Sequence, residues 1–213
     1  TQDDVIYFIG THVGTLLVPI AKKVKTVVGF EANEDTFWFI KANLCLNKIS
    51  NATIFNKDVG DGAKKVTFYK NTVNTGGSKI KPIKDSILYN YDNPKQEEVD
   101  MVALDPFIAE QSLTPPSGII MDIEGAEYFA LKGMQATLAK VRFLYVEFVP
   151  HHLQNVSNTS VEKFLKAITP HFSKAIFLKD NTQFDISSSE KELVKHLKTL
   201  EKNNVADDIL FTK

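Results

Sequence analysis

Acidic residues in this sequence stand at the ends of apolar runs that are short enough to be strands. Glu31 ends "KTVVGFE", Asp58 follows "ATIFNK", and Asp122 and Glu124 lie in "GIIMDIEG". A carboxylate at the end of a buried strand can accept a hydrogen bond from a ribose hydroxyl or an amino group, bind a cation, or take a proton as a general base. These residues are therefore the first candidates for chemistry.

A glycine turn precedes these acids. The segment "VIYFIGTHVGTLLVPIAKKV", residues 5–24, predicts a buried strand, a turn between Gly10 and Gly14, and a helix. At the carboxyl ends of parallel strands such a turn lets backbone N–H groups approach a ligand. The GxxxG spacing lacks the middle glycine of a dinucleotide fingerprint, whose place is taken by His12, and this disfavours a pyrophosphate ligand.

The second and third strand ends suggest a nucleoside. Glu31 lies 31 − 10 = 21 residues after Gly10, close to the roughly 20 expected for an acid that binds ribose hydroxyls. Asp58 could accept a bond from an adenine amino group, although an acid before glycine is equally typical of an ordinary turn. The three strand ends together predict an adenosine-shaped site without a phosphate cradle, which fits S-adenosylmethionine.

Apolar runs of strand length alternate with helix-period stretches, a pattern typical of a largely parallel sheet covered by helices on both faces. The predicted strands are 5–10, 26–31, 52–58, 119–123, 142–148, 174–178 and 207–212, and the predicted helices are 14–22, 35–47, 126–139, 159–169 and 189–201. Serine or threonine caps should start the last two helices. The final strand should pair with 174–178 and run antiparallel at or near a sheet edge.

The region of about 60–118 interrupts this alternation. "KKVTFYKN" and "VDMVALD" read as short edge strands, and between them lie "NTGGSKI" and "NYDNPKQEE". Long loops inside a compact domain are often functional, and a surface excursion is an equal alternative. We expect the determinants of the acceptor here, as an insertion within a single domain that spans residues 1–213.

Composition excludes several classes of protein. The 213 residues include 25 basic and 26 acidic side chains, a net charge of −1, so nothing attracts the chain to nucleic acid or to an anionic membrane. Cys45 has no partner cysteine, which indicates a reducing compartment, and we interpret it as a small buried group on a helix. No apolar run of membrane-spanning length and no signal-type start is present, so we expect a cytoplasmic protein.

With these residues in place, the chain resembles the FkbM-type methyltransferases, a branch of the class I S-adenosylmethionine-dependent enzymes. The resemblance covers about residues 5–150 and rests on "FIGTHVGTLLVPIAKKV", "VVGFEANEDTFWFIKANLCLNK", "NTGGSKI", "VALDPFIAE" and "GIIMDIEGAEYFALKGMQATLAKVRFLYVEF". It implies a Rossmann-like α/β fold, with a doubly wound seven-stranded sheet and an antiparallel last strand. The cofactor implied is S-adenosyl-L-methionine, and the residues implied to contact it are Gly10, His12, Gly14, Glu31, Asn33, Asp58, Val59 and Asp122.

Three positions depart from the family pattern. Family members usually carry an acid where Phe8 stands and an asparagine where His12 stands, and Ala32 replaces a common proline. The acid would organise the glycine loop and help to hold the cationic methionine end of the cofactor, whereas a phenyl ring offers no acceptor. If its loss is the defect, Phe8→Asp should tighten cofactor binding.

Methyl transfer requires a positioned acceptor and a base. Asp122 and Glu124 are two residues apart, so they share one face while the strand stays extended, and Gly125 permits a turn into the next helix. We interpret Asp122 as functional, and Glu124 as catalytic or, with Glu127, as part of the helix start. His151, which follows the fifth strand, is the predicted general base.

The same rim could hold a metal. Asp122, Glu124, Glu147 and His151 offer the oxygen-rich ligands that a divalent cation such as Mg²⁺ prefers. No dedicated metal motif accompanies them, and strand-end acids are common. We therefore favour a site without metal.

The sequence thus predicts an O-methyltransferase that acts on a hydroxyl of a small molecule, sugar or glycan. A catalytically inactive domain that keeps the fold for binding or as a scaffold is the alternative, and Phe8 is its best support. A nicotinamide-dependent oxidoreductase is disfavoured by the GxxxG spacing. No motif identifies the acceptor or the oligomeric state.

Overall fold

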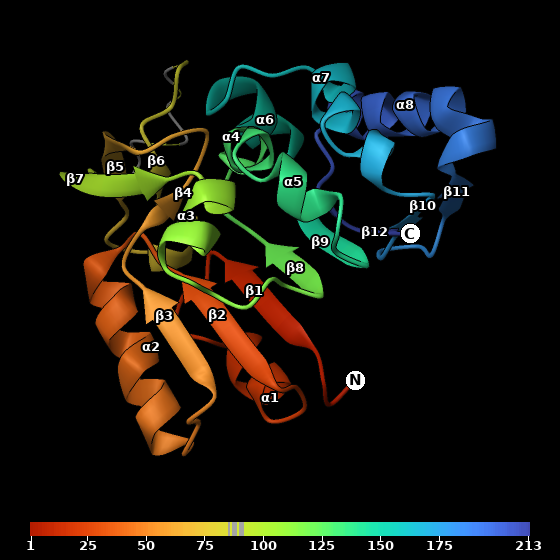
Figure 1. The fold of residues 1–213 in the computed structure, drawn as a ribbon. Helices are drawn as coiled ribbons and strands as arrows, with labels where there is room; N and C mark the ends of the chain where they lie inside the picture. Colours follow the sequence, from red (N-terminus) through yellow and green to blue (C-terminus); the bar gives the residue numbers. More distant parts are fainter. Residues whose placement is uncertain (85, 87–88, 90–91) are drawn as a thin grey trace.

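Strands of three to six residues form the main sheet. The structure is a computed structural model and describes residues 1–84, 86, 89 and 92–213. The strands of this sheet are β1 (Val5–Ile9), β2 (Thr26–Phe30), β3 (Ala52–Phe55), β8 (Gly118–Met121), β9 (Phe143–Phe148), β10 (Lys174–Phe177), β11 (Gln183–Asp185) and β12 (Asp207–Thr212). Their order across the sheet is β11-β10-β12-β9-β8-β1-β2-β3 (Figure 1).

The sheet is parallel around β1 and reversed near its other edge. β1 pairs in parallel with β2 and β8, β2 with β3, and β8 with β9. β12 runs antiparallel between β9 and β10, so the predicted reversal of the last strand and its pairing with 174–178 are confirmed, and the strand is third from one edge of the sheet. The sheet has eight strands where seven were predicted, because β11 adds an antiparallel strand to β10.

Eight α-helices lie in the described part of the chain: α1 (Leu17–Ala21), α2 (Glu34–Leu46), α3 (Leu104–Glu110), α4 (Glu127–Lys132), α5 (Gln135–Leu138), α6 (Pro150–Asn155), α7 (Val161–Lys166) and α8 (Ile186–Asn203). Two 3₁₀ turns, η1 (Thr75–Gly77) and η3 (Thr169–His171), accompany them. None of these helices is long and apolar enough to cross a membrane.

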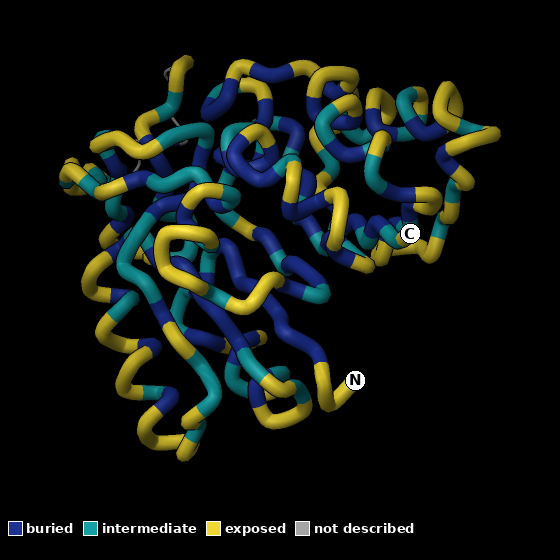
Figure 2. Tube along the Cα trace, viewed as in Figure 1, coloured by how far each residue is buried: buried dark blue, intermediate teal, exposed yellow. Residues whose placement is uncertain are grey.

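Both faces of β1 are covered, which explains its continuous apolar sequence. Tyr7 and Ile9 belong to the larger core, whose other members come mainly from residues 104–211. Ile6 and Phe8 belong to a smaller core with residues of α1 and α2. Figure 2 shows the central strands buried and the outer side of α2 exposed.

The region between β3 and β8 builds a second sheet. Its strands β4 (Asp58–Val59), β5 (Lys64–Lys70), β6 (Lys79–Ile80) and β7 (Lys95–Val102) are ordered β4-β7-β5-β6. The segments read as edge strands therefore pair with each other, in the antiparallel β5·β7 ladder, because their polar alternation suits a sheet with one solvated face. This small sheet lies beyond the carboxyl ends of β1, β2 and β3 (Figure 1). Residues 90–91 of the predicted loop "NYDNPKQEE" lie outside the described residues.

Several helix boundaries differ from the prediction for local reasons. The predicted helix 126–139 is split into α4 and α5, because the Asp105 carboxylate accepts the backbone N–H groups of Ala136 and Thr137 (2.8 and 2.9 Å) and so caps a separate helix start. Helix α8 begins before the predicted residue 189, since Asp185, not a serine, caps it. The predicted serine or threonine cap of 159–169 is confirmed in Ser160, which accepts the N–H of Lys163.

Cys45 lies on α2 as predicted, but its side chain is exposed rather than buried. Helix α2 packs on the sheet through Thr36, Ile40 and Leu44. Cys45 follows the last of these and therefore turns about 100° away from the core.

Candidate functional site

A cavity of about 310 Å³ lies over the carboxyl ends of β1, β2 and β8. One side is formed by the main sheet and its glycine loop. The other side is formed by residues of η1 and the small sheet, with Asn74, Thr75, Ser78 and Ile80 among those that line it. The two sheets thus enclose the place where ligands bind in doubly wound folds.

Most of the predicted cofactor residues line this cavity. They are Gly10, His12, Glu31, Asp58, Val59 and Asp122. Of the remaining two, Gly14 packs against Ile40, and its N–H bonds to Thr11 O at 2.9 Å, which closes the glycine loop. Asn33 is buried and caps α2 by accepting the N–H of Asp35 at 3.1 Å. Neither is among the lining residues, so their predicted cofactor contacts stay predictions.

Gly10 occupies the closest approach between the glycine loop and β8. Its φ is +84°, and a Cβ built there would lie 1.9 Å from the carbonyl oxygen of Asp122. Only glycine fits both conditions. The absence of a side chain therefore lets the glycine loop pack directly against the end of β8.

Glu31 anchors the glycine loop. Its Oε2 accepts the backbone N–H of His12 at 2.8 Å, and its Oε1 accepts the N–H of Asn33 at 3.0 Å. Burial raises the pKa of Glu31, while these backbone donors act in the opposite direction. A carboxylate has about four acceptor sites, so Glu31 can hold the loop and still accept ribose hydroxyls.

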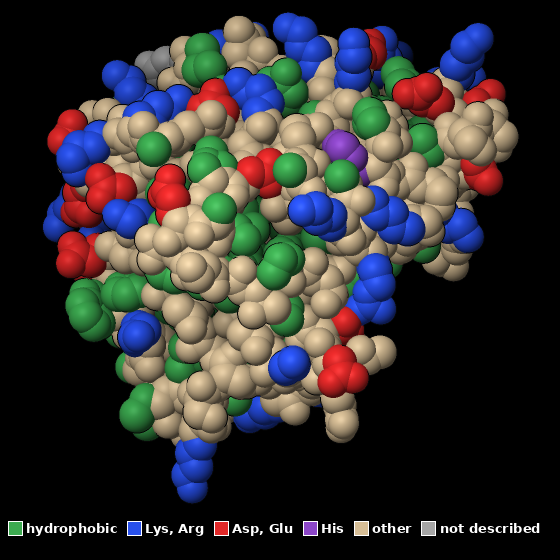
Figure 3. All heavy atoms as spheres, viewed as in Figure 1, with side chains coloured by type: hydrophobic (Ala, Val, Ile, Leu, Met, Phe, Trp, Pro, Cys, Tyr) green, Lys and Arg blue, Asp and Glu red, His purple; other side chains and the backbone are tan. Residues whose placement is uncertain are grey.

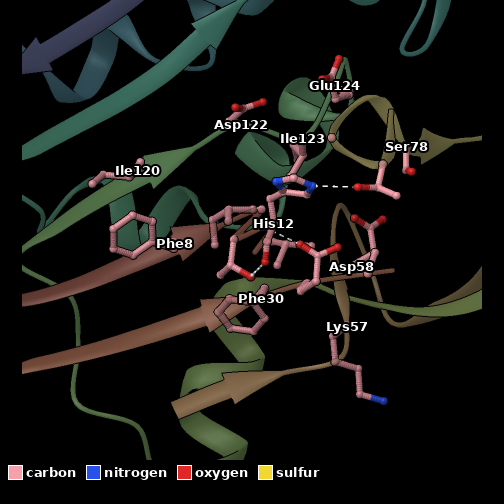
Figure 4. A pocket seen from close by; sticks show the side chains of 18 of the residues that line it. Phe8, His12, Phe30, Lys57, Asp58, Ser78, Ile120, Asp122, Ile123 and Glu124 are labelled. Atoms are coloured by element: carbon pink, nitrogen blue, oxygen red, sulfur yellow. Dashed lines mark hydrogen bonds between the residues drawn. The ribbon is translucent and has the colours of Figure 1, made fainter. Parts of the chain in front are cut away.

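Phe8 does not plug the glycine loop. Its side chain is only 2% exposed and packs in the smaller core with Leu17 and Ile40. The ring reaches the cavity wall beside Ile120, away from His12 and Asp58 (Figure 4). The glycine loop is therefore ordered without an acid at residue 8. Glu31 supplies the carboxylate that bonds to the loop.

Asp58 carries an unsatisfied acceptor into the cavity. It stands where the chain leaves β3 and enters the small sheet, is 5% exposed, and its Oδ2 has no hydrogen-bond partner among the described residues. Burial, with a smaller contribution from the charge of Glu31, raises the pKa of Asp58 to about 7. A buried oxygen without a partner is costly, and a ligand amino group would remove that cost.

His12 connects the two walls of the cavity. Its φ is +46°, a region that asparagine adopts more readily, and its Nε2 lies 2.9 Å from the Thr75 hydroxyl in η1. Burial lowers the pKa of His12, so the ring is neutral at pH 7. The residue that replaces the family asparagine thus joins the glycine loop to the small sheet.

Three carboxylates gather at the rim of β8 and β9. Asp122, Glu124 and Glu147 each offer an oxygen, and these oxygens lie within 4.8 Å of one another. Burial and the neighbouring charges raise the pKa values of both Asp122 and Glu147, more strongly for Glu147, and the two side chains share a hydrogen bond. Ionising both members of such a pair is unfavourable, because the two charges would lie close together in a buried site. Three oxygen ligands would also suit a divalent cation.

Glu124 does not cap the helix that follows it. The start of α4 has no side-chain cap, and Glu127 bonds back to the N–H of Ile123 at 3.0 Å. Glu127 is buried, which raises its pKa to about 7. Glu124 instead lines the cavity with Asp122, and Figure 4 shows both side chains on the side opposite Phe30 and Lys57.

The structure separates the two adjacent histidines. Pro150 starts helix α6, so His151 and His152 point in directions about 100° apart. The Nδ1 of His151 lies 3.2 Å from Asn155 Nδ2. His151 is not among the residues that line the cavity. The Nδ1 of His152 lies 2.9 Å from Glu124 Oε2. The role of His151 as general base stays a prediction, and the proline before the two histidines is the sequence signal for a helix start that turns them in different directions.

The fold and the site define the class of protein. The fold is similar to that of solved methyltransferases of low sequence identity. They include an FkbM methyltransferase from Methylobacillus flagellatus KT (TM-score 0.56, 16% identity, 100% of this chain and 44% of that chain). A putative methyltransferase from Streptococcus mutans, solved in complex with SAH, gives a TM-score of 0.53 (9% identity, 100% of this chain and 89% of that chain). An rRNA methylase from Streptococcus thermophilus gives 0.51 (10% identity, 100% and 87%). The chain therefore has the fold of a class I methyltransferase.

The family follows from the sequence match. The model of the methyltransferase FkbM domain matches residues 9–174, and the chain belongs to this family. No curated protein matches the chain. The chain spans less than half the length of the Methylobacillus protein.

Proposed function

We propose that the chain is an S-adenosylmethionine-dependent methyltransferase that methylates a hydroxyl of a small molecule, sugar or glycan. The observation that carries the proposal is one cavity that combines Glu31, beside the glycine loop, with the buried and unpartnered Oδ2 of Asp58. Ribose hydroxyls and the adenine amino group are donors, so the two acceptors suit the two ends of an adenosine. Gly10, whose side is packed directly against the backbone of Asp122, lines the same cavity.

The rim acids would serve the transfer. When bound, S-adenosylmethionine supplies a methyl group to the acceptor oxygen and leaves as S-adenosylhomocysteine. Asp122 and Glu124 line the same cavity, and either carboxylate can accept the proton that the acceptor hydroxyl loses. We assign the proton to this pair rather than to His151, which is not among the residues that line the cavity. Positioning and a carboxylate suffice, so we propose a reaction without metal.

The acceptor class rests on the polar wall of the cavity. Asn74, Thr75 and Ser78 of the small sheet side offer neutral hydrogen-bonding groups, which suit a hydroxyl-rich acceptor. The face drawn in Figure 3 intersperses Lys and Arg with Asp and Glu, and the net charge is −1, so attraction to nucleic acid is not favoured. We expect such an enzyme to act in the cytoplasm.

The alternative, a binding or scaffold domain without catalysis, is favoured by Phe8 alone. Titration calorimetry with S-adenosylmethionine, S-adenosylhomocysteine and NAD separates the two. The proposal expects binding of the first two ligands and none of NAD. If neither S-adenosyl ligand binds, the catalytic proposal fails.

A further inference from the structure

Glu124 lies in a turn, and the backbone of this turn does not by itself fix the orientation of the Glu124 carboxylate. Glu124 has φ +56° and Gly125 has φ +101°, so the chain bends sharply between β8 and α4. The carboxylate faces Asp122 and Glu147, whose oxygens lie within 4.8 Å. Like charges at this distance repel each other. A free Glu124 side chain would therefore turn away from the rim.

One described contact offsets this repulsion. The Nδ1 of His152 lies 2.9 Å from Glu124 Oε2, with the two side chains 19% and 21% exposed; the two atoms are not aligned as a hydrogen bond, so the contact attracts as an ion pair of a protonated imidazole and a carboxylate. Among the described residues this is the one ion-pair contact of Glu124 within 4.0 Å, and the Lys79 ammonium adds an attraction at longer range. Because Glu124 lines the cavity and His152 is not among its lining residues, the imidazole stands behind the carboxylate and acts through it.

The His152 ring is itself held in place. A Cβ at Gly125 would lie 2.9 Å from the Cβ of His152, so α6 packs directly on the turn that carries Glu124. On its other side, the buried Tyr89 ring lies 5.7 Å from the His152 ring, and the Tyr89 hydroxyl donates to the carbonyl oxygen of His151 at 3.3 Å. The imidazole therefore presents Nδ1 to Glu124 from a fixed position.

We propose that His152 is a positioning residue of the methyl-transfer site, which holds the Glu124 carboxylate at the cavity rim beside Asp122. The inference rests on the proposed function, because its consequence concerns the bound methyl donor. A carboxylate held at the rim attracts the positive sulfonium of S-adenosylmethionine but not the neutral thioether of S-adenosylhomocysteine. His152 therefore sets the preference between these two ligands.

The test is calorimetry with S-adenosylmethionine and S-adenosylhomocysteine on the whole chain. For His152→Leu we expect the affinity for S-adenosylmethionine to fall about three- to tenfold and that for S-adenosylhomocysteine to change less than about twofold. His152→Asn, which stays polar but carries no positive charge, should restore little of the loss, as expected for a contact that acts through charge. His151→Leu is the matched control and should leave the ratio of the two affinities unchanged.

Glu124→Gln is a second variant that tests the same contact, and its result does not depend on whether His152→Leu folds. It should reproduce the loss of preference, and adding His152→Leu to it should cause no further change, since the two residues act as one unit. An equal effect of His152→Leu on both ligands, or additive effects in the double variant, overturns the inference and leaves the proposed function intact. Failure of the wild-type chain to bind either ligand overturns the proposed function and the inference together.

Discussion

At one end of the cavity, Glu31 receives the backbone N–H groups of His12 and Asn33; at the other, Asp122, Glu124 and Glu147 face one another. The first carboxylate is fixed by the chain's own donors, which suits binding of a ligand in one orientation. The second group is buried and crowded, and burial first, then the neighbouring charges, raise the pKa values of Asp122 and Glu147. Carboxylates thus order a loop at one end, whereas at the other they are available to take a proton.

The largest effect is expected when an acid is placed at residue 8. Because Phe8 is 2% exposed in an apolar core, Phe8→Asp should destabilise the fold by about 4 kcal/mol or more. This replaces the expectation from sequence that the acid tightens cofactor binding. Urea unfolding measures the effect, with Phe8→Leu as the control that keeps an apolar side chain. A stable Phe8→Asp variant with tighter S-adenosylmethionine binding would show that the missing acid is the defect after all.

Gly10→Ala tests the binding end directly. The added Cβ would meet the Asp122 carbonyl oxygen at 1.9 Å in a backbone with φ +84°, so we expect a loss of about 3 kcal/mol in unfolding free energy and at least about a hundredfold loss in S-adenosylmethionine affinity. Gly62→Ala is the matched control, since no atom lies within 4 Å of its built Cβ. Equal behaviour of the two variants would contradict the close approach at residue 10.

Glu31→Gln should have a smaller effect. The new amide N–H₂ would face the N–H of His12 or Asn33, now bonded to the two carboxylate oxygens, at a cost of about 1–3 kcal/mol. We expect about tenfold weaker S-adenosylmethionine binding by calorimetry. Glu34→Gln, an exposed position at the start of α2, should change neither quantity. Unaltered binding in Glu31→Gln would show that Glu31 does not contribute to cofactor binding.

A pH dependence of stability is expected at Asp58. Its native pKa of about 7 lies above the ordinary value of 3.8, so the folded chain holds a proton that the unfolded chain releases. The stabilisation is complete at low pH and is lost as pH rises toward 7, by about 1 kcal/mol per pH unit. The unfolding free energy of the wild type relative to Asp58→Asn should fall accordingly between pH 5 and pH 7. A difference that does not vary with pH would mean that Asp58 is ionised in the native state.

The strand ends could be predicted from the sequence because they depend on local signals. Apolar runs that end in Glu31, Asp58 and Asp122 placed these acids at one rim, and the structure brings all three to one cavity. The small sheet could not be predicted as a sheet, since the pairing of β5 with β7 joins segments separated by about 30 residues, with no signal in either strand. The His12 contact with Thr75 and the Glu124 contact with His152 depend on that packing and on the helix start at Pro150.

The chain leaves the main sheet at Phe55 and enters the small sheet at Asp58, only three residues later. A ligand bound between the two sheets contacts both of them. It therefore connects two layers that the chain itself joins through the short segment 55–58. A bound ligand would therefore act as part of the protein core. Part of the binding free energy would stabilise the packing of the two sheets against each other.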